Sequence, residues 1–541
     1  MVNKRRIEKQ CTAQSALEIT SGEGYRVTGT MRDRFSCAAL SGRSVDRKVL
    51  SFLSALGFIM VLFAGCAAVG PDYVTPDLTA PGKWSTELSG GLISAPLDPQ
   101  AMASWWTTLN DPVLTSLIER AVSGNLDLRK SRARLVEARA RRGISGADRF
   151  PTLKTSGSVI RSRSGDKERT LFNAGFDADW ELDLFGRVRR SQEAAEADLE
   201  ASRENMQDVL ISLLAEVALN YLEVRSFQTR LSIASKSLKV QEETYMLTLW
   251  RSEAGLTSQL DVEQARSSLE ETRGTVPSLQ MGLDQALNRL AFLLGQNPGS
   301  LHRELSEEAS PMPVPPIEIA IGVPADALRR IPGVRQAERQ LAAQTARVGV
   351  ACTDRYPRFT LTGSIGLEAQ SIPDLFESAS QVLRIGPNFS WTLFDAGRIR
   401  QNIEVQNALQ EQALISYEEA ILTALRDVED ALFAYGKEQV RRKSLKEAAQ
   451  AAQTAEELAT SQYSSGLIDF QAVLNAQRSW LSLQNQLAVS DSDITSNLIR
   501  LYKALGGGWT PLPDDTPLAG PLTDEVSSAA PLASKASSVT P

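Results

Sequence analysis

The chain is poor in the side chains that most enzymes rely on. Its 541 residues include one histidine and four cysteines. His302 lies in a loop-like stretch between Pro298 and Pro311, so no group of histidines is available for a catalytic triad or a zinc site. The cysteines at positions 11, 37, 66 and 352 form no CxxC pair, which argues against a metal site or a disulfide framework. We therefore expect neither histidine-dependent catalysis nor a metal cofactor.

Long apolar runs are also scarce, and the one near the N-terminus is short. Residues 49–65 are mostly apolar, follow two basic residues and end in small residues before Cys66. The run falls short of the roughly 20 residues that a membrane-spanning helix needs. A positive flank, a short apolar run and small residues are typical of a secretory signal. We therefore expect residues 1–65 to be a leader that is removed.

Cys66 differs from the other cysteines in its context. The sequence Ala64-Gly65-Cys66 resembles the lipobox of bacterial lipoproteins, in which the cysteine is acylated and becomes the first residue of the mature chain. Ala67, rather than aspartate, follows it, which by the same resemblance favours sorting to the outer membrane. The alternative is cleavage by ordinary signal peptidase, with Cys66 incidental. We expect a covalent lipid on Cys66 and no other cofactor.

Positive charge is in deficit. The chain has 58 Lys and Arg against 65 Asp and Glu, and residues 1–65 hold ten of the basic and five of the acidic residues. The remainder therefore carries a net charge of −12. An acidic chain is repelled by the phosphate backbone, so nucleic acid is not an expected partner. Cys352 would be the only free thiol, which fits a periplasmic protein that does not rely on disulfides.

The chain contains an internal duplication. Residues 180–187 read WELDLFGR and residues 391–398 read WTLFDAGR, an offset of 211 that also relates Leu290 to Leu501 and Gly295 to Gly506. Upstream the offset is 206, as between residues 149–151 (RFP) and 355–357 (RYP). Chance does not maintain one offset over such a distance. The slip of five residues must lie between the two matched regions, where a surface loop would tolerate a change in length.

Glycine and proline are absent from the longest segments. Residues 187–254 contain neither, and the matching residues 398–465 contain only Gly436. Their abundance of Ala, Glu, Leu and Gln favours uninterrupted helix about 100 Å long. Helices of this length cannot be buried in a globule, so we expect them to pack along one another as coiled coils. Each turns at a Gly-Leu pair and returns as a shorter helix, over 258–294 and 469–505.

Before each long helix the apolar period changes to two. Alternating apolar residues predict β-hairpins over 152–182 and 358–394, with four strands of about ten residues and one apolar face each. Their polar turns are expected at 162–170 and 370–383. The alternative is a pair of soluble hairpins covering a core, but no core-forming partner is evident. Four strands are too few to close a pore and open edges cannot lie in lipid, so the strands must be shared between protomers.

Several motifs on this duplicated frame resemble the TolC/OprM outer-membrane factor family, in particular its lipoprotein branch of NodT type. The resemblance covers residues 66 to about 510, and it is carried by residues 66–73 (CAAVGPDY), Trp105-Trp106, residues 183–187 (DLFGR) and residues 502–509 (YKALGGGW). No Lys-Ser or Lys-Thr follows the glycines near 507, so they do not form a phosphate loop.

The resemblance implies a mixed α and β membrane protein. Its homotrimer would form a twelve-stranded transmembrane β-barrel continuous with a twelve-helix periplasmic α-barrel. The implied function is passive: an exit duct in the outer membrane of a Gram-negative bacterium, with outer-membrane lipid, a periplasmic adaptor and an inner-membrane RND-type pump as partners. Type I secretion uses the same frame. On this frame the segments are 1–65 leader, 66–110 lipidated and equatorial part, 111–295 first repeat, 296–325 equatorial linker, 326–505 second repeat, and 506–541 equatorial segment and disordered tail.

The resemblance also implies site residues at the two periplasmic tips. Gly255-Leu256 and Gly466-Leu467 would dock the adaptor, with the glycines needed to reverse the chain and the leucines exposed. A lock between Asp261 and Tyr463 would close the resting duct, while Ile468 stands where relatives have an arginine. Relatives place aspartate rings where this chain has Ala472 and Asn475, which leaves Asp469 as the nearby acid of the second tip. The alternative for Tyr463 is that it packs between helices.

Two rival functions are weaker. A coiled-coil lipoprotein that tethers the membrane would explain the helices and Cys66, but not the amphipathic strands. An enzyme lacks candidate residues, because the abundant acidic side chains lie at helix positions where solvated faces are the default. We therefore expect no enzymatic activity.

Overall fold

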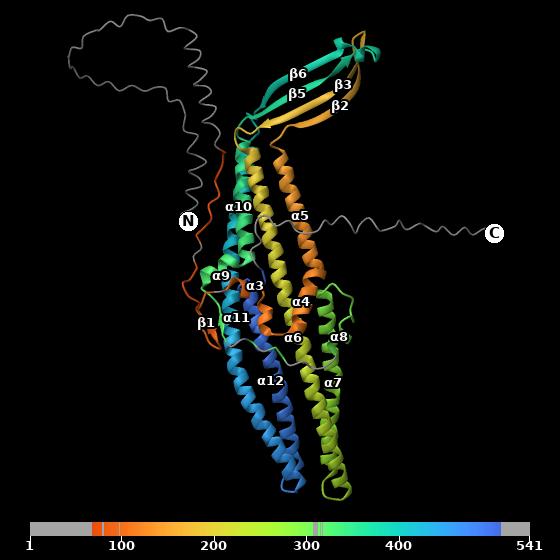
Figure 1. Cartoon of the computed structure of the whole chain (residues 1–541), viewed down its shortest axis with the longest axis vertical. Helices are drawn as coiled ribbons and strands as arrows, with labels where there is room; N and C mark the ends of the chain where they lie inside the picture. The colour runs from red at the N-terminus through yellow and green to blue at the C-terminus, as the bar shows by residue number, and fades with distance from the viewer. Residues whose placement is uncertain are drawn as a thin grey trace, which may run out of the picture.

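The computed structural model describes residues 68–77, 80–96, 98–306, 312–313, 315 and 318–509. Long helices run almost the whole length of the molecule, with a β-sheet at one end and two helical tips at the other (Figure 1). Cys66 and residues 510–541 lie outside the described residues, so the structure says nothing of the predicted lipid attachment or of the tail.

The duplication is visible in the helix boundaries. Two helices of 67 residues each return as helices of 35 residues, and the second pair repeats the first at the offset of 211: α6 (Arg187–Glu253) and α7 (Gln259–Leu293), then α11 (Arg398–Ser464) and α12 (Phe470–Ala504). These bounds lie within a residue of the predicted ones. Both long helices start directly after a glycine with positive φ, Gly186 (84°) and Gly397 (88°), where a side chain would be strained. Among the described residues, no helix is both long and apolar enough to cross a membrane.

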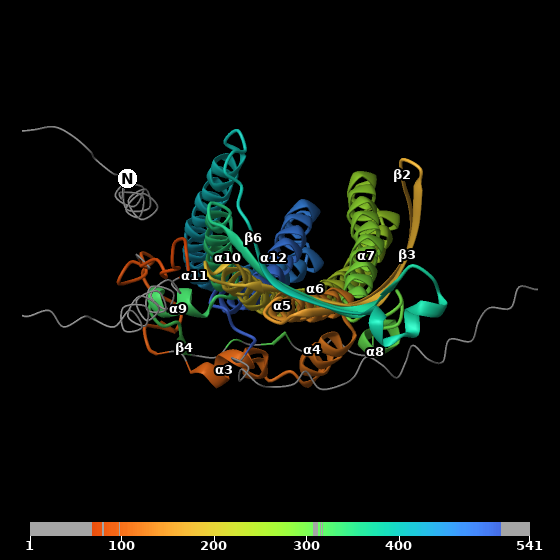
Figure 2. The ribbon, with the colours of Figure 1, turned by 90° about the horizontal axis from the view of Figure 1, so that it is seen from above.

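Two shorter helices lead up to the sheet, and they repeat at the offset of 206. They are α5 (Leu126–Ala147), which follows α4 (Pro112–Gly124), and α10 (Pro332–Thr353). In the half near the sheet the helices form a curved row in the order α11, α10, α6, α5 (Figure 2). In the half near the tips, α12 packs between α11 and α6, and α7 packs on α6. Each half therefore has two outer helices that face no neighbour on one side.

The sheet contains four antiparallel strands in the order β2-β3-β5-β6. They are β2 (Thr152–Ser164), β3 (Lys167–Leu182), β5 (Arg358–Ala369) and β6 (Gln381–Ser390). Both hairpins have the same register, because the pair Thr152 and Asp179 becomes Arg358 and Ser390 at the two offsets. Three of the strands are longer than the predicted ten residues, and β6 ends before Trp391 and Leu393.

One predicted turn is wrong. Most of residues 162–170 is strand, because Gly165 takes a φ of 62° and allows β2 and β3 to be joined through residues 165–166 alone. The Arg161–Glu168 ion pair of 2.6 Å supports the strands on either side. The second connection is longer and contains the short 3-10 helices η2 (Pro373–Phe376) and η3 (Ser378–Ser380). The five-residue slip between the repeats therefore lies in this second loop.

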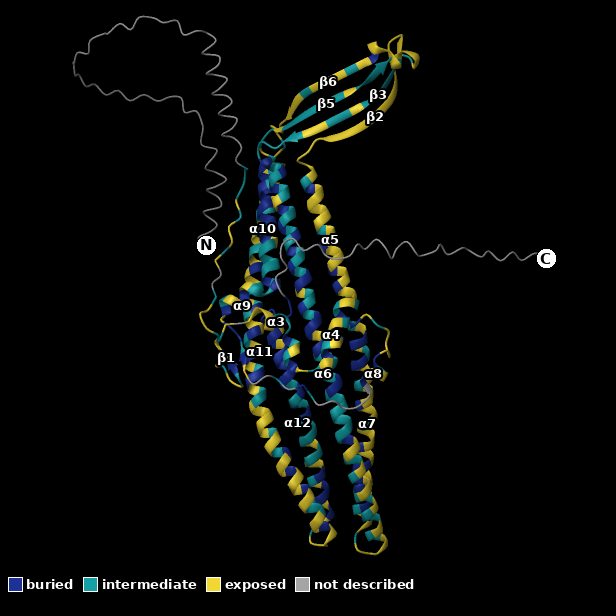
Figure 3. Ribbon diagram, in the orientation of Figure 1, coloured by how far each residue is buried: buried dark blue, intermediate teal, exposed yellow. Residues whose placement is uncertain are grey.

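The two faces of the sheet differ in polarity. Side chains of one parity are apolar, and several are more than half exposed: Leu153, Val159, Phe176, Ile365, Leu383, Ile385 and Phe389. No helix covers this face, since the sheet stands beyond the end of the bundle (Figures 1 and 3). The other face carries polar residues such as Ser156, Asp177 and Asn388. The hairpins therefore do not cover a soluble core.

A collar of short segments lies along one side of the helices, near the middle of their length (Figures 1 and 2). Strands β1 (Leu92–Ile93) and β4 (Ile319–Ala320) pair in parallel. The other pieces are α3 (Pro99–Ala103), η1 (Trp105–Leu109), α8 (His302–Ser306) and α9 (Pro324–Arg330). The Trp105 ring stacks on Tyr502 with a centroid distance of 5.4 Å, and both belong to the main apolar core. The three collar segments predicted from the sequence thus meet at one level, as far as they are described.

Candidate functional site

The two helical tips share one backbone motif. After α6, the Leu256 amide donates to the Arg251 carbonyl at 2.8 Å and the Gly255 amide to the Ser252 carbonyl at 2.9 Å. The second tip repeats both bonds, from Leu467 to Gln462 and from Gly466 to Tyr463. This is the Schellman ending of a helix, which requires a left-handed residue, and the two glycines have φ of 71° and 76°. Their predicted role in reversing the chain is confirmed.

The leucines that follow these glycines are exposed. Leu256 is 69% and Leu467 is 75% exposed, at the outermost point of each tip. A leucine that is mostly exposed gains little free energy from burial in its own chain, and its apolar surface is available to another molecule. The predicted exposure is therefore confirmed, whereas docking of an adaptor remains a proposal.

The Asp261 carboxylate accepts hydrogen bonds at the start of its own helix. It is the third residue of α7, and its Oδ2 accepts hydrogen bonds from Thr257 Oγ1 (2.5 Å), Ser258 Oγ (2.8 Å) and the Ser258 amide (3.1 Å). Together with the bond from the Asp261 amide to Ser258 Oγ, this is a capping box. The hydrogen bond from Thr257, followed by those from Ser258, lowers the pKa of Asp261. Asp469 is itself the N-cap of α12, the position that Ser258 has on α7, and it accepts from the Ala472 amide at 3.0 Å.

Tyr463 is buried and does not bond to Asp261. It is 4% exposed and packs against Phe470 in a small cluster with Ala265, Val473 and Leu474. Its hydroxyl has no hydrogen-bond partner among the described residues. The predicted Asp261–Tyr463 lock is thus not formed within this chain, because the carboxylate is held in the capping box and the ring is held in the apolar cluster. The alternative, packing between helices, is what the structure shows.

Arg251, in the other hairpin, also contacts Tyr463. Its guanidinium carbon lies 4.6 Å from the centre of the Tyr463 ring, and its Nη1 donates to the Tyr463 carbonyl at 2.8 Å. Sequence reasoning missed this contact and looked for an arginine at Ile468. The available signal was a lone cation in the last turn of α6, where it also faces the negative end of the helix dipole. Asn475 lies exposed and accepts a hydrogen bond from Gln471 Nε2 at 3.2 Å.

A buried polar group lies further from the tips. The Gln477 amide on α12 donates to Thr244 Oγ1 on α6 at 3.1 Å and to Glu456 Oε1 on α11 at 3.5 Å. Thr460 Oγ1 also donates to Glu456 Oε1, at 3.0 Å. Buried hydrogen bonds of this kind fix the register of the helices they join. The two hairpins of one chain are therefore tied together along their lower halves and at their tips.

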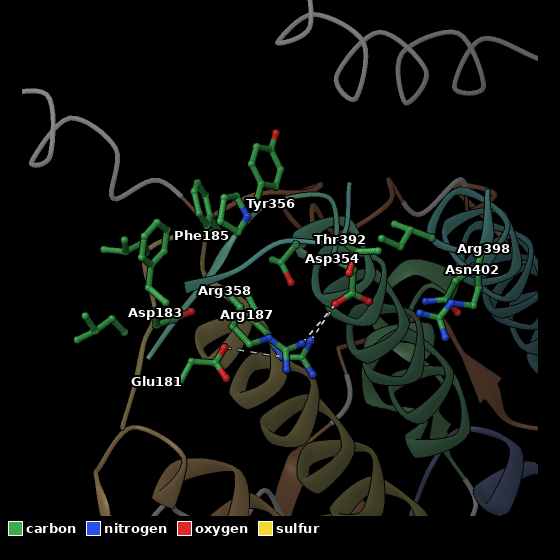
Figure 4. Close-up of a pocket in the computed structure, with 17 residues that line it drawn as sticks. Glu181, Asp183, Phe185, Arg187, Asp354, Tyr356, Arg358, Thr392, Arg398 and Asn402 are labelled. Atoms are coloured by element: carbon green, nitrogen blue, oxygen red, sulfur yellow. Dashed lines mark hydrogen bonds and ion pairs between the residues drawn. The ribbon is translucent and has the colours of Figure 1, made fainter. Parts of the chain in front are cut away.

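At the other end, a cavity of about 550 Å³ lies where the strands meet the helices (Figure 4). Its charged lining residues come from both repeats: Glu181, Asp183, Arg187, Asp354, Arg358 and Arg398. Arg187 Nη1 lies 2.9 Å from Asp354 Oδ1, which joins the start of α6 to the end of α10. Asp183 accepts from the Val188 and Arg189 amides at 3.0 Å and so caps α6. These side chains hold the junction together and include no nucleophile activated by a base.

The segment after Cys66 is fixed at the same junction. The Val69 amide donates to the Phe185 carbonyl at 3.0 Å, and Asp72 Oδ1 lies 2.6 Å from Arg190 Nη2. Arg190 is 5% exposed. Its burial opposes the charged form, but hydrogen bonds to Asp72 and Glu193 outweigh burial and raise its pKa. We call residues 68–77 the N-terminal strap, because they bind along the upper end of the helices.

A sheet with an uncovered apolar face, continuous with long helices and ending in two exposed tips, defines a membrane channel subunit. A family model described as outer membrane efflux protein matches residues 117–296 and 323–507, which are the two repeats. Toluene efflux pump outer membrane protein TtgF of Pseudomonas putida is 31% identical over 465 residues, covering 83% of this chain and 96% of its own. Nodulation protein T of Rhizobium leguminosarum bv. trifolii is 30% identical over 465 residues, covering 84% and 97%.

A solved structure shows the same fold. The outer-membrane channel OprN is 37% identical, covers 82% of this chain and 100% of its own, and has a TM-score of 0.77. The chain belongs to the outer membrane efflux protein family. This confirms the family that the sequence motifs indicated. The protein is an outer-membrane efflux channel with the fold of the trimeric channels, and it is not an enzyme.

Proposed function

We propose that three copies of this chain close into a duct whose tips dock a periplasmic adaptor, which connects the duct to an inner-membrane pump of RND type. The observation that carries the proposal is the four-stranded sheet with one uncovered apolar face and two open edges, β2 and β6. Contact between the apolar face and lipid would cost no free energy, whereas contact between this face and water would. Open edges cannot lie in lipid, so another copy must pair with them.

Three copies would supply twelve strands, each long enough to cross the hydrocarbon layer. The strands have 10 to 16 residues, against the roughly 9–11 that a tilted strand needs. The polar face would then line the lumen. Because α6 and α11 follow β3 and β6 after short connections, the helices would prolong the same wall into the periplasm.

The tips are the proposed docking site and the proposed gate. Both end in the same Schellman turn with an exposed leucine, so a trimer would present a ring of alternating Leu256 and Leu467. An adaptor with an apolar helical end would bury these leucines. We attribute closure of the resting duct to the same tips, because Arg251 holds the two hairpins of a chain together there. Rings of Asp469 and Asn475 would line its opening.

A lipid on Cys66 fits the position of the N-terminal strap. Ala68 packs against Gly186 so closely that a Cβ on the glycine would lie 2.6 Å from the Ala68 Cβ. Ala68 follows Cys66 by two residues in the sequence and lies at the level where the sheet meets the helices, which is where the membrane surface would lie. Acyl chains contribute about 0.8 kcal/mol for each buried CH₂.

The transported substrate follows from the pump rather than from this chain. TtgF, a similar protein, carries the name of a toluene efflux pump. We propose that the duct conducts whatever the pump and adaptor deliver. Passive conduction requires no cofactor.

The test is conductance. Purified full-length protein, shown to be trimeric by native mass spectrometry, is added to planar lipid bilayers, and stepwise ion currents are expected. A deletion strain should lose export of the substrates of the partner pump and regain it with the wild-type gene. Trimeric, inserted protein that passes no current in any variant, including those with disrupted tips, contradicts the proposal.

A further inference from the structure

The apolar face of the sheet ends in two arginines. Arg161 and Arg163 lie near the end of β2 that is farthest from the helices (Figure 1). We infer that these two side chains bind the phosphate groups of lipid A, the phosphorylated glycolipid in the outer leaflet of the outer membrane. The inference rests on the proposed function, because it requires the sheet to cross the membrane with its apolar face in lipid.

The two arginines share a face with the apolar side chains of β2. Side chains two residues apart point to the same face of a strand, so Arg161 and Arg163 continue the row that contains Leu153 and Val159. On this face of the four described strands, charged residues are found only at Arg161, Arg163 and Glu168. All three belong to the outer end of the first hairpin, and the second hairpin has no charge at the matching positions.

The position of the arginines matches the outer boundary of a membrane. On β3 the apolar face runs from Trp180, near the helices, to Thr170, which is opposite Arg161. The ten residue steps between them span about 33 Å along the strand, and a tilt of about 40° reduces this to a height of about 25 Å. Apolar bands of outer-membrane barrels have this height, with aromatic residues at the boundary. With Trp180 at the periplasmic boundary, Arg161 therefore reaches the lipid headgroups of the outer leaflet.

Both arginines retain donors for a ligand. Arg161 Nη2 donates to Glu168 Oε2 at 2.6 Å, and Arg163 Nη1 lies 3.9 Å from the other oxygen of the same carboxylate. Arg163 Nε also donates to the Gly165 carbonyl at 3.3 Å. The two side chains are 74% and 68% exposed, and a guanidinium group has five N–H donors, so most of their donors remain available. An ion pair that only stabilised the hairpin would need one arginine, whereas two arginines around one carboxylate leave a net positive charge.

The charge of this hairpin differs from that of the remaining chain. Residues 161–169 contain four basic and two acidic residues, although residues 66–541 carry a net charge of −12. The connection between β5 and β6, residues 370–380, lies at the same end of the sheet and contains two acidic and no basic residues (Figure 1). A planar guanidinium group binds phosphate through two parallel hydrogen bonds. A basic site at headgroup level therefore fits a phosphorylated lipid, and it is confined to the first hairpin.

Lipid binding by the purified full-length protein is the test. Native mass spectrometry would measure the binding of lipid A to the wild-type trimer and to Arg161→Ser with Arg163→Ser. Lys167→Ser with Arg169→Ser is the matched control, because it removes the same charge from the same hairpin at positions of the polar face. We expect lipid A to bind at least about tenfold more weakly to the first variant, which corresponds to about 1.4 kcal/mol. The control should bind it like wild type.

Glu168→Gln tests the same site in the opposite direction. The substitution removes the acidic group that competes with phosphate for both arginines, so lipid A should bind several-fold more tightly than to wild type. This variant also keeps both arginines and therefore does not depend on the folding of the double serine variant. Equal binding of lipid A to wild type, to Glu168→Gln and to the arginine variant would overturn the inference, as would equal losses in the arginine variant and its control.

Three probes identify the ligand chemistry. Dephosphorylated lipid A should bind equally to wild type and to the arginine variant, and neither phosphatidylglycerol nor inorganic phosphate should displace lipid A from wild type. Displacement by either one would overturn the assignment to lipid A. Trimer mass and conductance in planar bilayers are measured for each variant. Normal values together with unchanged lipid A binding reject this site and leave the proposed function standing, whereas wild-type protein that neither forms trimers nor conducts would reject both.

Discussion

Arg251 lies against Tyr463, with its guanidinium carbon 4.6 Å from the centre of the ring and its Nη1 2.8 Å from the tyrosine carbonyl oxygen. The two residues end different long helices, since Arg251 is in the last turn of α6 and Tyr463 is in the last turn of α11. One side chain therefore joins the two tips of a chain by both a hydrogen bond and a cation–π contact. For one tip to swing outward alone, both contacts must break.

Arg251→Ala should favour the open state of the duct. A hydrogen bond from a charged group contributes about 1.5–3 kcal/mol, a cation–π contact adds about 0.5–2 kcal/mol, and a trimer would contain three copies. We expect higher single-channel conductance in planar bilayers, with an intermediate value for Arg251→Lys, which keeps the charge but loses the planar group. Arg266→Ala, an exposed arginine of α7, is the control. Conductance equal to wild type in Arg251→Ala would exclude this contact from closure.

Tyr463→Phe should leave closure intact. The hydroxyl is buried without a partner among the described residues, so its removal deletes no hydrogen bond and relieves the cost of an unsatisfied polar group, about 1–3 kcal/mol. We expect unchanged conductance and an equal or higher unfolding temperature. Tyr463→Ala, which also removes the ring from its contacts with Arg251 and Phe470, should open the duct. If Tyr463→Phe alone increased the conductance, the hydroxyl would have to take part in closing the duct.

The sequence predicted the helices and the strand faces better than the contacts at the tips. Gly186, Gly255 and their counterparts predicted the helix ends. Glycine favours the left-handed backbone found there, so a single position in the sequence is enough to indicate the boundary. The choice of partner for Tyr463 depends on how two helices 200 residues apart in sequence are rotated toward each other. Asp261 is about as far from Tyr463 in the sequence as Arg251 is, but its carboxylate bonds within its own capping box instead of to Tyr463.

Acid should loosen the first tip. The pKa of Asp261 is lowered, first by the hydrogen bond from Thr257, so the stabilisation by its carboxylate is complete above the ordinary aspartate pKa, about 3.9. It is lost as the pH falls from there through the lowered pKa of the folded tip. Hydrogen exchange of peptides covering residues 255–263, corrected for the intrinsic rate, should accelerate below about pH 4. Asp261→Asn should exchange faster at neutral pH and lose this pH dependence; an identical acid response in both proteins would assign it to other groups.

Leu256→Asp combined with Leu467→Asp should abolish export without closing the duct. Both side chains are exposed in the chain, so the substitutions should change the stability of the fold by less than about 0.5 kcal/mol each. Trimer mass and conductance should match wild type, while a deletion strain should not regain export. Ser464→Asp adds a charge at the second tip and keeps both leucines, which separates loss of apolar contact from charge. Full export by a folded double variant would refute docking through the leucines.

Cys66→Ser should remove the lipid but not the channel. If Cys66 is acylated, mass spectrometry of the mature N-terminal peptide from wild-type protein will show a modified cysteine as the first residue, and the modification will be absent from Cys66→Ser. Insertion and conductance should persist, because neither the apolar face of the sheet nor the N-terminal strap, which is held by the ion pair between exposed Asp72 and buried Arg190, depends on the acyl chains. Cys37→Ser is the matched control, since Cys37 lies in the predicted leader and its replacement should leave the modified peptide unchanged. A wild-type peptide with an unmodified Cys66, or one that begins at another residue, would contradict lipid attachment at this site.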